Sequence, residues 1–508
     1  SLTTGINYYP ATTIYNLNST ANFGQDGTFG GLATAQGNAD TNGIGNFFYP
    51  VPTGFKALCT NNLPEPAITP KEHFNAVLYA GDNTTGRQIT GVGFQPDLVW
   101  LKNRSVTNYH TLFDSVRGVT NYLFANDASA PQSNSSSVTA FTSDGITVNH
   151  NASFGNNNAN SSNYVTWNWK AGGTEPVKTY VVKVVSDSGN KYRFDDFAAS
   201  AQTVDLQEGG TYTFDQSDSS NSGHPFRLST TSNGTHASGS EYTTGVVTYG
   251  TPGNSGAYTK ITVAASTATL YYYCSVHSGM GGQVNTNSTF GSSYFDGNIK
   301  STVSANQTSG FSIVKYTGTG SNVSVGHGLN AVPDLFIVKS LSTNNWWVYT
   351  TAIDGSLDYL SLNTTAAAGN ASQTAPTSTL FYQNNTNASI AYCFASKPGY
   401  SKISTYTGNG NVNGPFVNCG FKPAWIMIKK TNATNNWIMF DNKRDVDNVA
   451  TQYLLANSPQ AEAALNPAVD FVSNGFKIRN TGNAMNTNAG TYFYMAFAEA
   501  PFKYANAR

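Results

Sequence analysis

The chain has 508 residues, a net charge of −1 and only 11% charged residues, against an average of about 25%. This balance gives no attraction to nucleic acid or to an anionic membrane surface, and no apolar run approaches the roughly 18 residues that cross a bilayer. We therefore expect no nucleic-acid partner and no membrane insertion. Hydrophobic residues make up 39% of the chain and aromatic residues 13%, which is enough to build packed cores, and the length predicts several domains.

Residues 1–70 are rich in turn residues, so we expect an N-terminal arm and a proline-punctuated connector. Strand-like pieces occur at 6–9, 12–15 and 47–49, but the region is too small for a β-sandwich with its own core. Open strand edges promote aggregation, so the arm should add its strands to a sheet edge of its own chain or of a neighbour. We predict that residues 1–50 are ordered mainly by another copy of the chain or by another protein.

A pattern that recurs three times organises most of the remaining chain. Each copy has a strand-like run after a conspicuous proline, at Leu98–Lys102, Leu335–Lys339 and Trp425–Lys429. Fourteen residues after the prolines stand His110, Trp347 and Trp437. Each copy closes on a strand with alternating aromatic residues, which is typical of one packed face of a sheet. The repeat predicts an all-β, multi-domain protein with three similar sandwich-like modules.

The repeat also sets the expected domain boundaries. The modules span residues 71–173, 311–398 and 399–508. A different domain occupies 174–288, between the first two modules, and the polar stretch 289–310 is expected to be a linker.

Within residues 174–288, one short loop concentrates metal-binding side chains. Cys274, His277 and Met280 follow a strand-like run at the spacing Cys-x2-His-x2-Met, and His224 lies fifty residues upstream of Cys274. One thiolate, two imidazoles and a weak thioether form the ligand set of a blue-copper site, because soft sulfur and imidazole suit copper. The alternative is a packed loop in which Cys274 is a buried small hydrophobe.

These motifs resemble the cupredoxin family over about residues 176–288, and the short Cys-to-Met loop looks most like that of the amicyanins. The resemblance implies a Greek-key β-sandwich and a copper ion held by His224, Cys274, His277 and Met280. It also implies electron transfer as an alternative function, which would need an exposed apolar patch near His277 for partner docking.

The repeated module resembles units of structural proteins of marine bacteriophages, in which Gly-Phe-x-Pro-Asp-Leu-Val-Trp-x-Lys-Asn opens a unit. Residues 93–103 carry this pattern almost unaltered. The resemblance implies a virion or extracellular location and a tail fibre, head appendage or filament subunit. Its partners would be other copies of itself or other virion proteins, bound through the N-terminal arm.

The sequence contains few motifs that are typical of catalysis. No phosphate-binding loop, nucleophile elbow or zinc-protease signature occurs. Asp97 and Asp334 recur but the third module has Ala424, so we interpret them as turn caps. The pairs Asp114/Arg117 and Asp441/Arg444 are interpreted as local ion pairs. We expect no enzymatic activity.

Two Asn–Trp clusters raise the alternative of a carbohydrate-binding adhesin, because rings cover sugar C–H faces and amides bond hydroxyls. They comprise Asn344, Asn345, Trp346, Trp347, Asn435, Asn436 and Trp437. The other interpretation is that the tryptophans are core residues and the asparagines form turns, and the repeated register favours it. The sequence therefore predicts a structural protein for assembly, display and adhesion, with a glycan-binding adhesin and a blue-copper electron carrier as alternatives.

The four cysteines, Cys59, Cys274, Cys393 and Cys419, are scattered along the chain. We expect them to be free and mostly buried, without a disulfide framework.

Overall fold

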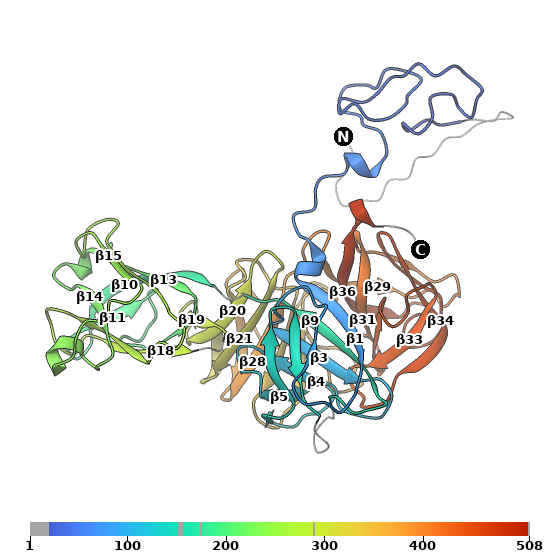
Figure 1. The fold of residues 1–508 in the computed structure, drawn as a ribbon. Coiled ribbons are helices and arrows are strands. Elements are labelled where there is room, and N and C mark those ends of the chain that lie inside the picture. The colour runs from blue at the N-terminus through green and yellow to red at the C-terminus, as the bar shows by residue number, and fades with distance from the viewer. Residues whose placement is uncertain (1–19, 151–156, 173–174, 288–289, 506–508) are drawn as a thin grey trace. The chain divides into compact units, whose positions relative to one another are not determined.

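The computed structural model describes residues 20–150, 157–172, 175–287 and 290–505. The chain divides into two compact units, Ser1–Pro66 and Ala67–Arg508. The described residues form β-strands and a few short 3-10 helices but no α-helix, which confirms the all-β prediction (Figure 1). Among these residues no helix has the length and apolar character needed to cross a membrane.

The described part of the first unit is built from loops around one carboxylate. Asp40 accepts hydrogen bonds from the backbone amides of Ile44 and Ala57, at 3.0 and 2.8 Å, and from the side-chain amide of Asn62 at 2.7 Å. A single β-bridge joins Asn38 to Phe47. The expected strand at 47–49 is therefore wrong beyond this bridge, and the expected strands at 6–9 and 12–15 lie outside the described residues. The predicted role of another subunit stays a prediction.

Module 1 is a sandwich of two sheets. Its main sheet has the order β1 (Phe74–Ala80), β9 (Asn163–Trp169), β3 (Leu98–Asn103), β4 (Thr111–Asp114), β5 (Asn121–Phe124) and β6 (Gln132–Ser133). Its second sheet has the order β2 (Arg87–Ile89), β8 (Gly145–Val148) and β7 (Val138–Thr142).

Modules 2 and 3 repeat this strand order. The matching strands of module 2 are β21 (Phe311–Thr317), β28 (Ala388–Phe394), β23 (Leu335–Ser340), β24 (Trp346–Thr350), β25 (Asp358–Ser361) and β26 (Gly369–Asn370), with β22 (Gly320–Gly326) and β27 (Leu380–Asn385) as its second sheet. Those of module 3 are β29 (Ser401–Thr407), β36 (Thr491–Pro501), β31 (Phe421–Lys430), β32 (Trp437–Asp441) and β33 (Ala450–Leu455). In module 3 the sheet continues into β34 (Ala463–Val472), β35 (Gly475–Ile478) and β30 (Phe416–Asn418).

The expected linker at 289–310 contains two strands, so the prediction is wrong for those residues. Residues Ser292–Tyr294 and Ser301–Asn306 form β19 and β20, which extend the main sheet of module 2 beyond β21. The stretch looked like a linker because it is rich in serine, yet Ser293 and Ser301 are buried and hydrogen-bonded.

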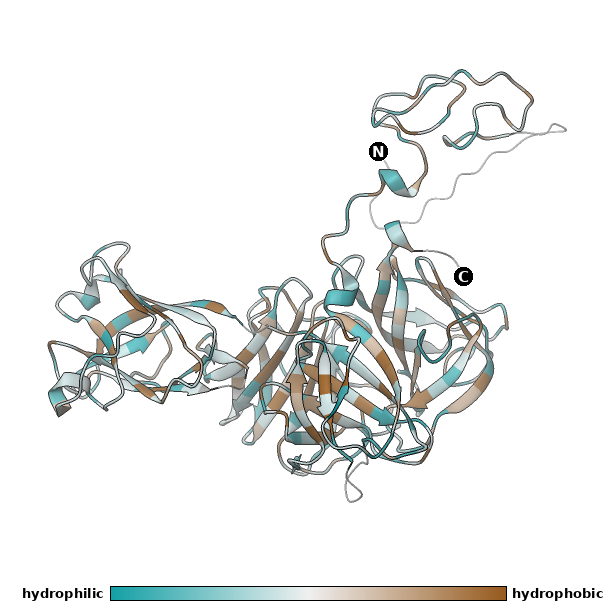
Figure 2. Ribbon diagram, in the orientation of Figure 1, coloured by the Kyte–Doolittle hydropathy of each residue, from teal (hydrophilic) through white to brown (hydrophobic). Residues whose placement is uncertain are grey.

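The three main sheets share one hydrophobic core. The central strands β3, β23 and β31 are buried at every residue, because one face lines the module's own core and the other lines the core shared with the neighbouring modules. Figure 2 shows hydrophobic residues on β3 and on the strands beside it. The largest shared-core side chains are the tryptophans, namely Trp100, Trp167, Trp169, Trp346, Trp425 and Trp437.

Three buried lysines show that the modules close into a ring. Lys102, Lys339 and Lys429 occupy the same position on β3, β23 and β31. Their ammonium groups donate to carbonyl oxygens of Pro459, Ala128 and Thr365, at 3.2, 3.2 and 2.9 Å. Module 1 thus contacts module 3, module 2 contacts module 1, and module 3 contacts module 2. Burial lowers the pKa of each lysine to about 8.

The aspartate–arginine pairs also join modules. Asp114 accepts a hydrogen bond from the Tyr392 hydroxyl of module 2 at 2.7 Å. Asp441 accepts one from the indole nitrogen of Trp167 of module 1 at 3.0 Å. The interpretation as purely local ion pairs is therefore incomplete. Each carboxylate pairs with the arginine of its own module and also accepts a hydrogen bond from a neighbouring module.

Equivalent hydrogen bonds in the three modules show that the expected alignment of module 2 is wrong by one residue. The side-chain oxygens of Asn126, Asn363 and Asn457 accept from the backbone amides of His110, Trp346 and Trp437, each at 2.8 Å. Trp346, and not Trp347, is therefore the equivalent of Trp437. Trp347 is half-buried and packs edge-on against Tyr359.

Residues 177–287 form a separate two-sheet sandwich, called here the inserted sandwich. One sheet has the order β11 (Asn190–Phe194), β10 (Val177–Ser186), β13 (Thr211–Asp215), β16 (Tyr258–Thr262) and β15 (Val246–Tyr249). The other has the order β12 (Val204–Gln207), β18 (Gly282–Asn287), β17 (Leu270–Cys274) and β14 (Phe226–Ser229). Aromatic residues fill the core between them, and Phe295 from the following junction completes it.

We expect Trp437→Ala to lower the free energy of unfolding by about 3–5 kcal/mol, because it removes a fully buried indole from the shared core. Calorimetric unfolding of the purified chain measures this loss. Trp347→Ala is the matched control and should have a clearly smaller effect. An unchanged melting profile for Trp437→Ala would contradict a core role.

Asp97 provides a prediction on pH. Its carboxylate is fully buried and accepts from the Ser115 hydroxyl at 2.8 Å and the Ala171 amide at 2.7 Å. Burial outweighs these bonds and raises its pKa from 3.8 to about 6. The folded state therefore holds the proton more tightly than the unfolded state, so this contribution to stability is full below the unfolded pKa and is lost as the pH rises through about 6.

We expect Asp97→Asn, which mimics the protonated carboxyl, to be more stable than the parent chain at pH 7, by up to about 3 kcal/mol. The difference should shrink toward pH 4. Urea unfolding followed by tryptophan fluorescence across this range measures it, and parallel pH profiles for the two proteins would refute the assignment.

Candidate metal centre

The strand register of the inserted sandwich assembles the predicted metal ligands. Cys274 ends β17 and pairs with Phe226 of β14. His224 stands two residues before Phe226, so the same pairing brings it to Cys274 across fifty residues of sequence. His277 lies on the loop that follows β17.

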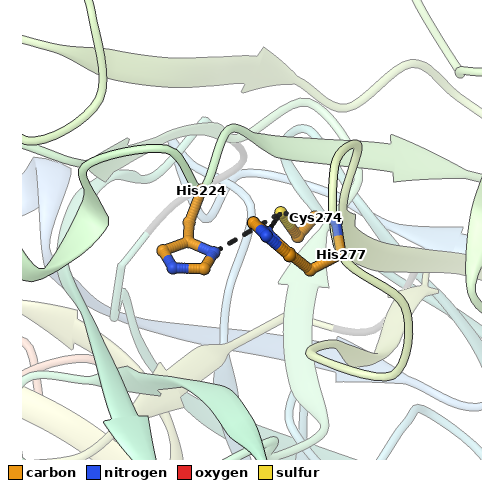
Figure 3. Close-up of side chains that lie close together, drawn as sticks. All are labelled: His224, Cys274 and His277. Carbon is orange, nitrogen blue, oxygen red and sulfur yellow. Dashed lines mark hydrogen bonds between the residues drawn. The ribbon is translucent and has the colours of Figure 1, made fainter.

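The three side chains converge (Figure 3). The sulfur of Cys274 lies 3.9 Å from Nδ1 of His224 and 3.8 Å from Nδ1 of His277. The ring centroids of the two histidines are 4.5 Å apart. Within the described residues this is the one group of three or more His, Cys, Asp or Glu side chains close enough to hold a metal ion.

The environment favours metal binding over a plain packed loop. Cys274 is fully buried, whereas His277 is exposed and His224 half-buried. The backbone amide of His277 donates to the Cys274 sulfur at 3.4 Å, a contact that holds the two ligands together within the loop. Burial, aided by the nearby His277, lowers the pKa of His224 and so keeps its imidazole neutral and able to bind a metal.

Met280, the fourth predicted ligand, is buried in the same core as Cys274. Its carbonyl accepts from the backbone amide of Tyr192 at 3.0 Å, which fixes the far end of the ligand loop. Its role as the long axial ligand stays a prediction.

Two further residues shape the centre, and the sequence did not identify them. The Asn233 side chain donates to the Ser278 hydroxyl and accepts from the Gly279 amide, both at 2.8 Å. The ring nitrogen Nε2 of His236 lies 2.9 Å from the carbonyl oxygen of Cys274. Both belong to the distant 229–238 turn, so no local spacing could reveal them.

The donor set fits one ion. With metal–ligand bonds of about 2.0–2.1 Å to nitrogen and 2.3 Å to sulfur, as for zinc, sulfur–nitrogen separations of 3.8 and 3.9 Å match angles of about 120–130° at the metal. A trigonal set of two imidazoles and one thiolate is characteristic of a copper electron-transfer site.

The predicted glycan-binding cluster is not an exposed platform. Trp346 and Trp437 have no exposed surface, so the glycan-binding interpretation is wrong for both. The amides of Asn345 and Asn436 accept from Asn363 and Asn457, at 3.0 and 2.8 Å, and thereby fix turns. Asn344 and Asn435 cap the amide of the next residue in the same turns.

All four cysteines are free, as predicted. Cys393 and Cys419 are buried, and burial raises the pKa of both thiols, that of Cys419 to about 12. They are therefore inert thiols and not part of a reactive site.

A family model described as Domain of unknown function (DUF7483) matches residues 69–193 and 284–501. The match covers all three modules and leaves out most of the inserted sandwich, including His224, Cys274, His277 and Met280. No curated protein and no solved structure matches the chain.

We expect the purified chain to bind one Cu(II) and to gain a strong visible absorption from the Cys274 thiolate. Cys274→Ser should abolish the colour and leave the circular dichroism spectrum unchanged. Cys59→Ser is the matched control, because Cys59 lies in the first unit, and it should keep the colour. A colourless titration, or colour that survives Cys274→Ser, would contradict this site.

Proposed function

The chain belongs to the family of the Domain of unknown function (DUF7483), and we propose that it is a non-enzymatic structural protein of a phage particle. The observation that carries this proposal is the shared core of the three modules. This core joins the three modules into one body, and apolar side chains fill the space between their inner sheet faces. We interpret this arrangement as a structural body and not as domains that flank a catalytic cleft.

The phage assignment rests on residues 93–103, whose pattern resembles phage structural units. Most of this stretch lies on or beside β3, which is buried on both faces. Its pattern is therefore that of a core-building strand, which suits a structural module better than a binding loop.

Such a body is suited to display. The inserted sandwich is anchored to module 2 through Asp205, whose carboxylate accepts from the Thr302 hydroxyl at 3.0 Å and forms an ion pair with Lys300 at 3.5 Å. Tyr180 of the sandwich also donates to the Ser293 carbonyl at 3.0 Å. These two hydrogen bonds, the ion pair and the burial of Phe295 attach the inserted sandwich to module 2.

Copper binding is the second proposed function, and the convergence of His224, Cys274 and His277 favours it. When bound, copper would supply one-electron transfer. The exposed imidazole of His277 and its neighbour Val276, with 57% of its surface exposed, would connect such an ion to a partner at the surface.

Labelling of particles tests the structural role. Antibodies raised against residues 67–508 should decorate purified particles of the encoding phage in electron micrographs, and peptides of the chain should appear in the particle proteome. Absence of the chain from complete particles would refute the proposal.

The N-terminal unit gives a separate prediction. Because residues 67–508 form their own compact unit, we expect deletion of residues 1–66 to leave its melting temperature unchanged. The same deletion should prevent incorporation into particles, since we assign subunit contacts to this region. Particles that incorporate the truncated chain normally would show that the arm is not the assembly element.

A further inference from the structure

Module 1 carries an exposed aromatic pair beside the turn between β3 and β4. The rings of Tyr109 and Phe124 stack with their centroids 4.3 Å apart and 27° between their planes. Tyr109 is still 43% exposed although Phe124 covers one face of its ring, so the exposed part of the ring is its opposite face and its edge. The pair lies in module 1, whereas the metal ligands lie in the inserted sandwich, so it is a separate candidate site.

The turn that carries Tyr109 has the same hydrogen bond in all three modules. The side chain of Asn108 accepts from the backbone amide of Tyr109 at 2.8 Å. In modules 2 and 3 the first asparagine of the turn accepts the equivalent bond from the second, at 2.8 and 2.9 Å. Tyr109 therefore stands where module 2 has Asn345 and module 3 has Asn436.

The aromatic pair occurs in module 1 only. Phe124 ends β5, and the equivalent residues are Ser361 in module 2 and Leu455 in module 3. Both positions are thus aromatic in one copy and neither is aromatic in the other two. Since modules 2 and 3 build the same turn without it, the fold does not require this pair.

The internal repeat also shows where the amide of Asn126 points. The side-chain oxygens of Asn126, Asn363 and Asn457 accept equivalent bonds from the backbone, each at 2.8 Å. In modules 2 and 3 the nitrogen of the same side chain donates to the second asparagine of the turn, at 3.0 and 2.8 Å. In module 1 the same anchoring bond directs Nδ2 of Asn126 toward the side chain of Tyr109.

This amide is left without an acceptor, because Tyr109 has an aromatic ring where the other modules have a carboxamide oxygen. Nδ2 of Asn126 bonds no acceptor among the described residues, and it is not fully buried. The turn of module 1 thus places an available N–H donor beside an exposed aromatic ring.

We propose that Tyr109, Phe124 and Asn126 form a binding site for a neutral hexopyranose, free or at the end of a glycan. The open face of the Tyr109 ring covers the apolar C–H face of the sugar, and Nδ2 of Asn126 donates to a sugar hydroxyl. The area suits a sugar and not a protein partner, because protein interfaces bury about 800 Å² on each side and one aromatic side chain supplies at most about 250 Å². The site depends neither on the metal centre nor on the proposed role in a particle.

The charges near the turn favour a neutral sugar. Arg104, at the start of the same loop, is paired with Glu462 at 2.7 Å and offers no free cation. Asp127 directly follows Asn126 in the chain, so an acidic sugar would meet a negative charge close to the donor.

Saturation-transfer NMR on the full chain tests the proposal with the methyl β-glycosides of glucose, galactose and mannose. We expect at least one of them to bind, with the strongest saturation at the C–H protons of one face of the ring. The glucuronide that matches the glucoside carries a carboxylate and should bind at least ten-fold more weakly than the best neutral glycoside. Failure of all three neutral glycosides to bind, or equal binding of the glucuronide, would overturn the proposal.

Tyr109→Asn is the decisive variant, because it gives module 1 the turn that modules 2 and 3 already have. Asn126 can then bond the new side chain, so the melting temperature should not fall, while glycoside binding should weaken at least ten-fold. If this variant does not fold, Phe124→Leu, which copies Leu455 of module 3, provides the same test. Tyr109→Phe keeps the ring and should bind as the parent chain does. Tyr249→Asn removes an exposed ring from the inserted sandwich and is the matched control.

Two results would show that the site lies elsewhere. One is glycoside binding that survives the loss of the ring at position 109. The other is an equal loss of binding in the Tyr249→Asn control.

Discussion

The shared core is the constraint on which the rest of the structure depends. A strand such as β3 or β31 is buried on both faces, so its module cannot stand alone without exposing a wide apolar surface. Three modules solve this problem together, because each covers the inner faces of the other two. The chain in this way reproduces within one polypeptide the closed symmetry that most oligomers obtain from separate subunits.

Burial of the inner faces also dictates the polar groups at the module boundaries. The buried lysines are acceptable because each ammonium meets backbone carbonyls of its own and of the next module. The aspartate–arginine pairs follow a stricter rule. Asp114 and Asp441 each have a donor from a neighbouring module, Tyr392 and Trp167. At the third boundary, between modules 2 and 3, neither group is present. Thr350 of module 2 stands where the other modules have the aspartate, and Met495 of module 3 stands where they have the donor Tyr392 or Trp167. The carboxylate and its donor are absent together, because an unpaired buried charge is strongly destabilising.

The sequence predicted those features that repeat or that form local motifs. The three modules follow from the matching runs on β3, β23 and β31, and the metal cluster follows from the Cys-x2-His spacing with one distant histidine. The sequence comparison placed Trp347 in the position that Trp346 occupies. In module 2 one residue fewer separates the proline from the equivalent tryptophan, and counting residues from the proline cannot detect such a shift within a turn. The sequence comparison also treated Ser293 and Ser301 as linker residues, since polar residues buried by hydrogen bonds resemble solvated ones in composition. The tethers Asn233 and His236 depend on contacts across the inserted sandwich, which no sequence spacing records.

The position of the inserted sandwich follows from the same architecture. Between modules 2 and 3 the chain passes from β28 to β29 in a few residues. The Asp334 carboxylate accepts a hydrogen bond from the backbone amide of Ser396 at 2.6 Å and so fixes the chain where it leaves module 2. Asp97 caps the corresponding exit from module 1 through Ala171. The amide of the next residue, Gly172, donates to the Ser304 hydroxyl at 3.0 Å, so the chain leaves for the insertion and returns to module 2 at nearly the same point.

An insertion whose ends are fixed together adds little loop-closure entropy and leaves every strand pairing of the ring in place. The family match is interrupted within the same region, at residues 194–283. The three-module body can therefore gain a domain of different chemistry at this junction without any change in the shared core, and the metal ligands are confined to that added domain.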